Sequence, residues 1–247
     1  MSSSTAPGRK LALLTGASGG IGRAIAIRLA HDGYDLVLTG RDSARLEKSA
    51  RLARNASEGT SATRVVAADL NNARSPTTIV DAVRESSDHI DLLISNAGVA
   101  VSETIEETSL ETWETMMRVN ATAPFFLIQQ AIPLLRAASS PTVIVISSVV
   151  GHVGYARQAA YSASKHALAG FTKAMARELQ PEGIRVHIVS PGGVATEMVG
   201  ATRPDLDPAD LIQTEDIAGV VSFLASSSGT GVVDEINIRR TASTPWG

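Results

Sequence analysis

Residues 15–22 read TGASGGIG, and they join an expected strand at 11–15 to an expected helix at 21–31. Glycines at positions 16, 20 and 22 allow a tight turn, a close approach of a pyrophosphate to the backbone, and close packing of the helix on the strand. The amino terminus of the helix would offer free N–H groups to a phosphate. An ordinary strand-to-helix connection is also compatible with such a turn, but its place after the first strand favours dinucleotide binding.

The rest of the chain continues an alternation of short apolar runs and longer helical patterns. Strands are expected at residues 11–15, 35–39, 64–67, 92–95, 142–147, 185–190 and 235–238. Helices are expected at about 21–31, 43–55, 76–86, 110–138, 160–179 and 215–226. Gly33 is expected to stop the first helix in a left-handed conformation, and Thr108 with Glu111 has the spacing of a capping box before the long fourth helix.

This alternation predicts an α/β protein with a three-layer Rossmann fold. Its doubly wound, mostly parallel seven-stranded sheet would carry helices on both faces. Ligands of such sheets bind beyond the carboxyl ends of the strands. No linker interrupts the alternation, so residues 10–247 are expected to form a single catalytic domain after a flexible lead-in at residues 1–9.

Composition excludes several kinds of function. The chain of 247 residues has no cysteine, so disulfide scaffolds, thiolate metal sites and cysteine nucleophiles are ruled out, and no metal is expected. A formal charge of −3 with the signs interspersed gives no field that would attract nucleic acid or an anionic membrane. The most continuous apolar run, at 143–146, is far shorter than the roughly 20 residues of a membrane helix. The lead-in does not resemble a secretory signal, which favours a cytoplasmic protein.

The end of the second expected strand indicates which dinucleotide binds. A site for NAD usually carries an acidic residue there to bind the ribose hydroxyls. Gly40 stands at that place, and the arginine fork of Arg41 beside it suits a 2′-phosphate. NADP(H) is therefore favoured over NAD(H). The alternative is that Arg41 only begins the solvated face of the next helix, which Asp42 would cap.

One tyrosine and one lysine have a spacing that suits acid/base chemistry. Tyr161 and Lys165 are four residues apart in a helical pattern, so both project from the same face. A nearby ammonium group stabilises a phenolate and lowers a pKa that is about 10 in water. Tyr155 has Ala159 at the matching position and lacks this support. Ser147 and Ser148 end a buried strand at the ligand-binding edge, where a hydroxyl could bind a substrate oxygen.

Together these motifs resemble the short-chain dehydrogenase/reductase family over residues 10–226. The matching pieces, in order, are the TGxxxGIG loop at 15–22, Asp69, Asn96-Ala97-Gly98, Asn120, Ser148, the Tyr161/Lys165 pair and the PGGVAT segment at 191–196. Tyr161 follows Ser148 by thirteen positions, the interval usual in the family, which selects Ser148 over Ser147.

The resemblance implies a role for each matching residue. Tyr161 would exchange the proton, Lys165 would lower its pKa and hold the nicotinamide ribose, and Ser148 would fix the substrate oxygen. Asn120 would hold a water that relays protons. The cofactor-binding residues implied are Gly16, Ser18, Gly20, Ile21, Gly22, Arg41, Asp69, Leu70, Asn96, Ala97, Gly98, Tyr161, Lys165, Pro191, Gly192, Val194 and Thr196.

The substrate pocket is expected to be lined by Val150, His152, Tyr155 and Met198. His152 suggests catalysis, but a histidine in a loop is more often a polar lining or surface group. The segment between Thr196 and Glu215, where the family places its substrate lid, is short and polar and indicates modest specificity. Residues 231–240, GVVDEINIRR, lack the Asp-Gly-Gly ending common in the family, which puts in doubt an oligomer contact at that ending.

The predicted function is transfer of a hydride between NADP(H) and a small-molecule carbonyl or secondary alcohol, with Tyr161 as acid/base. One alternative is a 3-oxoacyl thioester reductase of fatty-acid type, and another is a non-catalytic dinucleotide-binding sensor. A sensor has no need of the combination of Ser148, Tyr161 and Lys165, which argues against it. The resemblance also implies a homodimer or homotetramer.

Overall fold

Seven parallel strands form one sheet, and their carboxyl ends meet at one edge. The computed structural model describes residues 8–203 and 205–245. The strands are β1 (Leu11–Thr15), β2 (Asp35–Gly40), β3 (Thr63–Ala67), β4 (Leu92–Ser95), β5 (Thr142–Ile146), β6 (Arg185–Pro191) and β7 (Glu235–Ile238). Their order is β3-β2-β1-β4-β5-β6-β7, and all six pairings are parallel. The order reverses between β1 and β4, the place where ligands bind in sheets of this topology.

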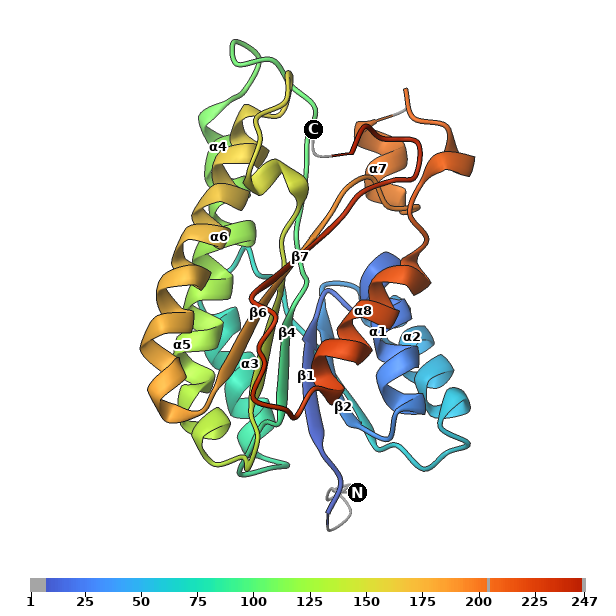
Figure 1. Ribbon diagram of the computed structural model, residues 1–247, viewed down its shortest axis with the longest axis vertical. Helices are drawn as coiled ribbons and strands as arrows, with labels where there is room; N and C mark the ends of the chain where they lie inside the picture. Colours follow the sequence, from blue (N-terminus) through green and yellow to red (C-terminus); the bar gives the residue numbers. More distant parts are fainter. Residues whose placement is uncertain (1–7, 204, 246–247) are drawn as a thin grey trace.

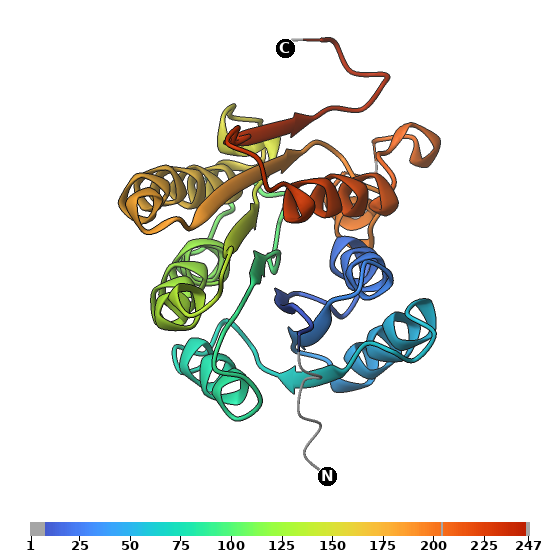
Figure 2. The same ribbon diagram turned by 60° about the horizontal axis from the view of Figure 1, so that its bottom comes forward.

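Helices cover both faces of the sheet, as Figures 1 and 2 show. On one face lie α1 (Gly20–His31), α2 (Ser43–Ala56) and α8 (Thr214–Ser226). On the other lie α3 (Ser75–Arg84), α5 (Ala123–Arg136) and α6 (Ala159–Leu179), with α4 (Leu110–Met117) beside α6. The short α7 (Glu197–Thr202) lies near the carboxyl ends of the strands, at the top of Figure 1. The predicted Rossmann fold is therefore confirmed, with a sheet that is parallel throughout its described strands.

Burial on both faces explains why the strands are continuous apolar runs rather than alternating ones. In β1, Ala12 and Leu14 pack into the core that contains Ile25 of α1. Leu11 and Leu13 pack into the core that contains Leu127 of α5. Every side chain of the strand is buried, because successive residues face opposite covered sides.

The expected long helix at 110–138 is wrong in one respect, because it is interrupted. A π-helical turn, Arg118–Thr122, separates α4 from α5. Pro124 has no N–H to donate to the carbonyl of Asn120 four residues earlier, so one hydrogen bond of the α-helical ladder is missing at this point. The helix start also differs: the Ser109 hydroxyl, rather than that of Thr108, accepts the capping hydrogen bond, from the N–H of Thr112 at 3.0 Å.

Other boundaries agree to within two residues, except that α7 was expected to be loop. Gly33 has the left-handed conformation expected of it, with φ of 93°. The expected lead-in falls largely outside the described residues, which begin at residue 8. Within the described ranges, no helix is long and apolar enough to cross a membrane. In the same ranges, no group of three or more His, Asp or Glu side chains is placed to hold a metal ion.

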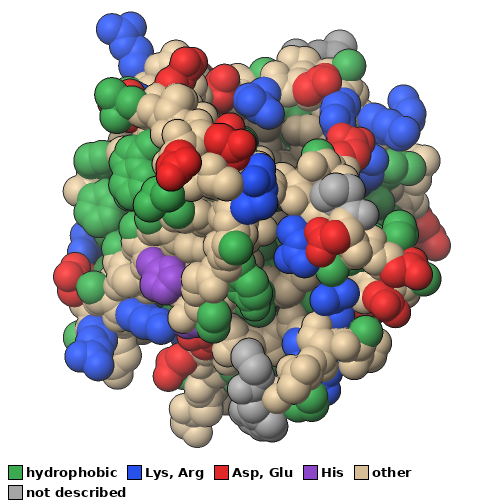
Figure 3. Space-filling view, turned by 90° about the horizontal axis from the view of Figure 1, so that it is seen from above, with side chains coloured by type: hydrophobic (Ala, Val, Ile, Leu, Met, Phe, Trp, Pro, Cys, Tyr) green, Lys and Arg blue, Asp and Glu red, His purple; other side chains and the backbone are tan. Residues whose placement is uncertain are grey.

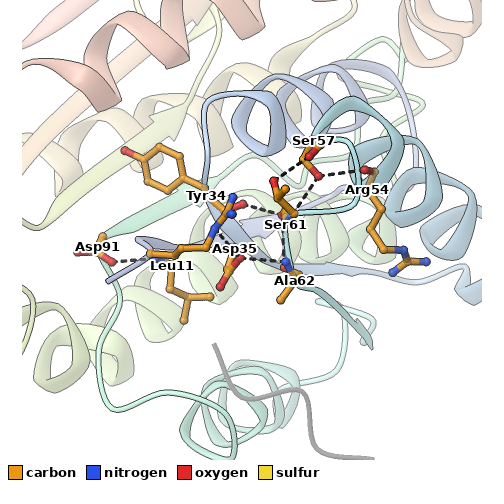
Figure 4. Close-up of polar contacts among 10 residues, drawn as sticks. Leu11, Tyr34, Asp35, Arg54, Ser57, Ser61, Ala62 and Asp91 are labelled. Atoms are coloured by element: carbon orange, nitrogen blue, oxygen red, sulfur yellow. Dashed lines mark hydrogen bonds and ion pairs between the residues drawn. The ribbon is translucent and has the colours of Figure 1, made fainter. Parts of the chain in front are cut away.

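Two buried carboxylates organise the end of the sheet opposite the candidate site (Figure 4). An oxygen of Asp91 accepts a hydrogen bond of 2.7 Å from the N–H of Leu11, and one of Asp35 accepts a hydrogen bond of 2.9 Å from the N–H of Ala62. The Ser61 hydroxyl donates to the Tyr34 carbonyl at 2.7 Å. The Asp91 bond ties the start of β1 to the start of β4, and the other two tie the start of β2 to the segment that enters β3.

Candidate active site

The glycine turn after β1 is locked to the loop after β4. The Thr15 hydroxyl accepts hydrogen bonds from the N–H groups of Asn96 and Ala97 at 2.9 and 3.0 Å, and the Asn96 side chain donates to the Thr15 carbonyl at 2.9 Å. Gly16 has a φ of 68°, and a Cβ there would lie 2.8 Å from the Cα of Ala97. A Cβ on Gly22 would collide with the Gly16 carbonyl. Only glycine fits at these two positions.

A cleft of about 300 Å³ opens above this turn at the switch point of the sheet. All but three of the expected cofactor-binding residues line it: Gly16, Ser18, Gly20, Ile21, Gly22, Arg41, Asp69, Leu70, Asn96, Ala97, Gly98, Tyr161, Lys165 and Thr196. The exceptions come from the loop after β6. Val194 is buried in the core beside α8, Gly192 lines a second cavity, and the Pro191 carbonyl accepts a hydrogen bond from the Ser148 hydroxyl at 3.3 Å.

The backbone conformation of the cleft and the charge at the helix terminus that faces it both suit a dinucleotide. The first turn of α1 contains no acidic residue, and its N-cap, Gly19, makes no side-chain capping bond, so the positive end of a twelve-residue helix faces the cleft. At the far end, a Cβ on Gly40 would collide with the Ser18 hydroxyl. A side chain at position 40 would therefore require the Ser18 hydroxyl to move.

Arg45 is a second basic residue of the cleft that the sequence analysis missed. Its guanidinium forms an ion pair with both carboxylate oxygens of Glu197 at the start of α7, at 2.9 and 3.0 Å, and lies 3.4 Å from the Ser18 carbonyl. Asp42 caps α2 by accepting a hydrogen bond from the Arg45 N–H at 2.9 Å, as the alternative for Asp42 proposed. The four-residue spacing from Arg41 to Arg45 was the available signal.

Tyr161 and Lys165 lie on the first turns of α6 and meet Ser148, which follows β5. The Lys165 ammonium nitrogen lies 5.9 Å from the centre of the Tyr161 ring and donates to the Ile146 carbonyl at 3.1 Å. Burial lowers the pKa of Lys165 to about 8. Burial also raises the pKa of Tyr161 above its ordinary value, against a smaller lowering by the Ser148 hydroxyl. Lys165 is not among the causes of the Tyr161 shift, so the expected lowering of this pKa by Lys165 is not seen in this structure.

Asn120 lies fully buried in the π-helical turn and ties the loop after β4 to α6. Its side-chain oxygen accepts from the Val99 N–H at 2.8 Å, and its amide nitrogen donates to the Val99 carbonyl at 2.9 Å and to the Ser164 hydroxyl at 3.0 Å. The side chain thus fixes the loop next to Lys165. A proton relay through Asn120 stays a prediction.

A second cavity, of about 200 Å³, adjoins the first at Tyr161 and Met198. Its lining includes Ser148 and three of the four residues expected in the substrate pocket: Val150, Tyr155 and Met198. Two arginines that the sequence analysis did not assign, Arg203 and Arg240, also line it.

The placement of His152 in the substrate pocket is corrected. Its Nε2 lies 2.5 Å from a carboxylate oxygen of Glu235 on β7 and 3.3 Å from the Ser190 hydroxyl. The half-buried carboxylate of Glu235 draws the ring toward the edge of the sheet and away from the cavity. The same imidazole nitrogen faces both partners, so these three residues do not have the relay geometry of a catalytic triad.

A dinucleotide cleft that joins a tyrosine, lysine and serine at the switch point is the arrangement of a nicotinamide-dependent oxidoreductase. The family model for short chain dehydrogenases matches residues 10–207. The chain belongs to the short-chain dehydrogenase/reductase family and is an oxidoreductase.

Named relatives and solved structures agree with this assignment. An uncharacterized oxidoreductase of Staphylococcus saprophyticus is 36% identical over 208 residues, which cover 83% of this chain and 88% of that one. A 3-oxoacyl-[acyl-carrier-protein] reductase of Aquifex aeolicus is 32% identical over 92% of this chain and 94% of its own. The alcohol dehydrogenase of Thermococcus sibiricus complexed with 5-hydroxy-NADP superposes with a TM-score of 0.87 at 28% identity, covering 96% and 99% of the two chains.

Proposed function

We propose that residues 10–247 act as one catalytic domain that interconverts a carbonyl compound and a secondary alcohol with NADP(H). The observation that carries this proposal is the position of Tyr161 and Ser148. Tyr161 lines both the dinucleotide cleft and the second cavity, and Ser148 lines the second cavity beside it. A substrate in the second cavity therefore has its reacting oxygen beside an acid/base group at the boundary with the cofactor.

The cofactor is held by the glycine turn, by the loop after β4 and by the arginines at the end of β2 and the start of α2. When bound, the nicotinamide dinucleotide supplies or accepts the hydride. Gly40 stands where a site for NAD would carry an acidic side chain, and Arg41 lines that end of the cleft. Arg41, supported by Arg45, binds the 2′-phosphate, which makes NADP(H) preferred over NAD(H).

Tyr161 provides the proton, and its burial suits the reductive direction. A pKa above the ordinary value keeps the phenol protonated at neutral pH, so it donates to the carbonyl oxygen as the hydride arrives. Ser148 holds the same oxygen through its hydroxyl. Lys165, beside the ring, stabilises the phenolate that remains.

A thioester reductase is the second candidate, and the Aquifex aeolicus relative supports it. That relative is named as a 3-oxoacyl-[acyl-carrier-protein] reductase and matches along nearly the whole chain. Both candidates use the same three residues and differ only in what enters the second cavity.

A second copy of this chain is the proposed partner of the apolar face on α4 and α5. Figure 3 shows hydrophobic side chains gathered at the left of the view, on the side where these helices lie. Exposed large apolar residues of the two helices are Leu110, Trp113, Phe125 and Phe126, and exposed Ile105 precedes α4. Light scattering checks this: wild type is expected as a dimer or tetramer, and Phe126→Glu as a smaller species.

The experiment that tests the function is NADPH oxidation with a panel of ketones, aldehydes, quinones and 3-oxoacyl thioesters. Turnover of at least one member supports the proposal, and the preferred member separates the two candidates. Silence across the panel, with NADPH binding intact by fluorescence titration, would favour the non-catalytic sensor.

A further inference from the structure

The segment that follows the last strand, β7, lies beside the second cavity, and Arg240 and Ser243 line it. β7 runs beside β6 with Ile238 opposite Pro191, and the N–H of Gly192 donates to the Ile238 carbonyl at 2.8 Å. Arg239 and Arg240 follow this last bond directly. They therefore lie next to the loop that begins at Gly192, on the side of the sheet edge where Ser148 and Tyr161 meet.

Arg239 fixes the turn that presents Arg240. Its guanidinium donates to the carbonyls of Arg240, Thr241 and Ser243 at 3.1, 3.3 and 2.9 Å. The N–H of Ser243 closes the same turn on the Arg240 carbonyl at 3.0 Å. The two neighbouring arginines thus differ in their contacts. The Arg239 guanidinium is hydrogen-bonded to backbone carbonyls, whereas the Arg240 side chain lines the cavity.

The Arg240 side chain lies across Gly193. A Cβ at that glycine would stand 3.5 Å from the Arg240 Cδ, an ordinary van der Waals distance, so the arginine stem lies close over the glycine. Arg240 is half-buried and shares the cavity wall with Ser148 and Tyr161.

Of the two arginines that line this cavity, Arg240 is the one that forms no ion pair with the described residues. Arg203 is already held by Asp205 through two bonds of 2.8 and 2.7 Å. Across the described ranges 8–203 and 205–245, no carboxylate lies within ion-pair distance of Arg240. Arg203 lowers the pKa of the Asp205 carboxyl and Arg240 adds to this lowering, so the charges of Arg240 and Asp205 act on each other at longer range. Much of the remaining wall is apolar, with Val150, Met198 and Leu206. A guanidinium beside an apolar wall is a site for an anion that can form two parallel hydrogen bonds.

We propose that Arg240 binds an anionic group of the substrate, a carboxylate or a phosphate, while Ser148 and Tyr161 hold the reacting oxygen. This inference rests on the proposed function and narrows its substrate class to ketones or alcohols that carry such a group. The charge at one end of the cavity and the hydroxyls at the other fix the orientation of the carbonyl.

Matched substrate pairs test the proposal. The first pair is an oxo acid and its methyl ester, tried at several chain lengths. The second is a 3-oxoacyl thioester of coenzyme A, which carries phosphates, and the same acyl group on N-acetylcysteamine, which carries none. Wild type is expected to prefer the charged member of one pair, and that pair identifies carboxylate or phosphate as the anion.

Arg240→Met should then raise KM for the charged member about 10- to 100-fold, the range for one charged hydrogen-bonding partner, and leave the neutral member unchanged. Arg240→Lys should recover part of the loss, and Arg51→Met, at an exposed position of α2, should have no effect. An equal loss for both members would mean that Arg240 is only structural and would overturn the proposal, as would a wild type that prefers the neutral members.

Calorimetric titration of the same anions separates this proposal from the proposed function. Binding that is lost in Arg240→Met, without turnover of any panel member, would sustain the anion site and reject the reductase. Turnover of neutral ketones, without discrimination between the members of a pair, would support the reductase and reject the anion site.

Discussion

At the amino-terminal end of the sheet, Asp35 and Asp91 are buried against backbone N–H groups that need acceptors. At the carboxyl end, Lys165 and Tyr161 are buried where their charged forms are disfavoured. The first pair satisfies the backbone and so stabilises the fold. The second pair costs stability in exchange for a titratable site, which is the pattern expected where chemistry is performed. Stability and reactivity are thus separated to opposite ends of the same strands.

The largest effect should come from Tyr161→Phe. Removing the phenolic hydroxyl leaves the substrate oxygen without its proton source, and we expect turnover to fall by about 10²- to 10⁴-fold. NADPH affinity, measured by fluorescence titration, should stay within about twofold, since the ring remains. The matched control is Tyr34→Phe, which removes a hydroxyl bonded to the Ala225 carbonyl at 3.3 Å far from the site. Turnover that survives in Tyr161→Phe would remove this tyrosine from the mechanism.

Asp91→Ala tests the other end of the sheet. The N–H of Leu11 would lose its buried acceptor, so the free energy of unfolding should fall by about 1–3 kcal/mol in urea titrations. The kcat of the folded fraction should be unchanged. A lower kcat at full folding would show that the two ends are not independent.

Arg41→Ala should weaken NADPH binding about tenfold, because one charged partner of the 2′-phosphate is lost. NADH has no such phosphate, so its affinity should hardly change. Fluorescence titration of both cofactors measures the difference, with Arg51→Ala as the control. Equal weakening for both cofactors would mean that Arg41 contributes only to the overall positive charge of the cleft and does not bind the 2′-phosphate.

The smallest effect is expected from Glu197→Gln. Arg45 is shared between this carboxylate and the cleft, and Glu197 is largely exposed while Arg45 is partly exposed, so their ion pair is weak. Freeing Arg45 should tighten NADPH binding by about two- to threefold and NADH binding by less. Weaker NADPH binding in this variant would mean that the Arg45–Glu197 pair holds the cleft in shape.

The fold could be predicted from the sequence because its signals are local. β1 and β5 are apolar along their length, and the glycine turn fixes the connection between β1 and α1. The π-helical break before α5 could not be predicted from the periodicity of apolar residues. A proline such as Pro124 is tolerated in the first turn of a helix and does not by itself indicate a π-helical turn. The glycine turn and the Tyr161/Lys165 pair could likewise be found from spacing alone.

The positions of residues whose contacts lie far away in the sequence could not be predicted from local patterns. His152 turns to Glu235, and Arg240 lies across Gly193, because separate loops meet only in the folded chain. The sequence marked the ending of residues 231–240 as unusual without indicating where its arginines would lie. The pKa of Tyr161 also depends on burial that no spacing reveals.

The most direct test of the separation between stability and reactivity is the stability of Lys165→Met as a function of pH. Burial lowers the pKa of Lys165 from 10.5 to about 8, so between these values the unfolded chain binds this proton more than the folded one. Wild type therefore gains stability from Lys165 as pH rises through this window and lacks that gain at pH 7. We predict that inactive Lys165→Met is more stable than wild type at pH 7, that the difference shrinks toward pH 10, and that exposed Lys48→Met shows neither effect. A Lys165→Met variant that is less stable at pH 7, or a difference that does not change with pH, would contradict the account.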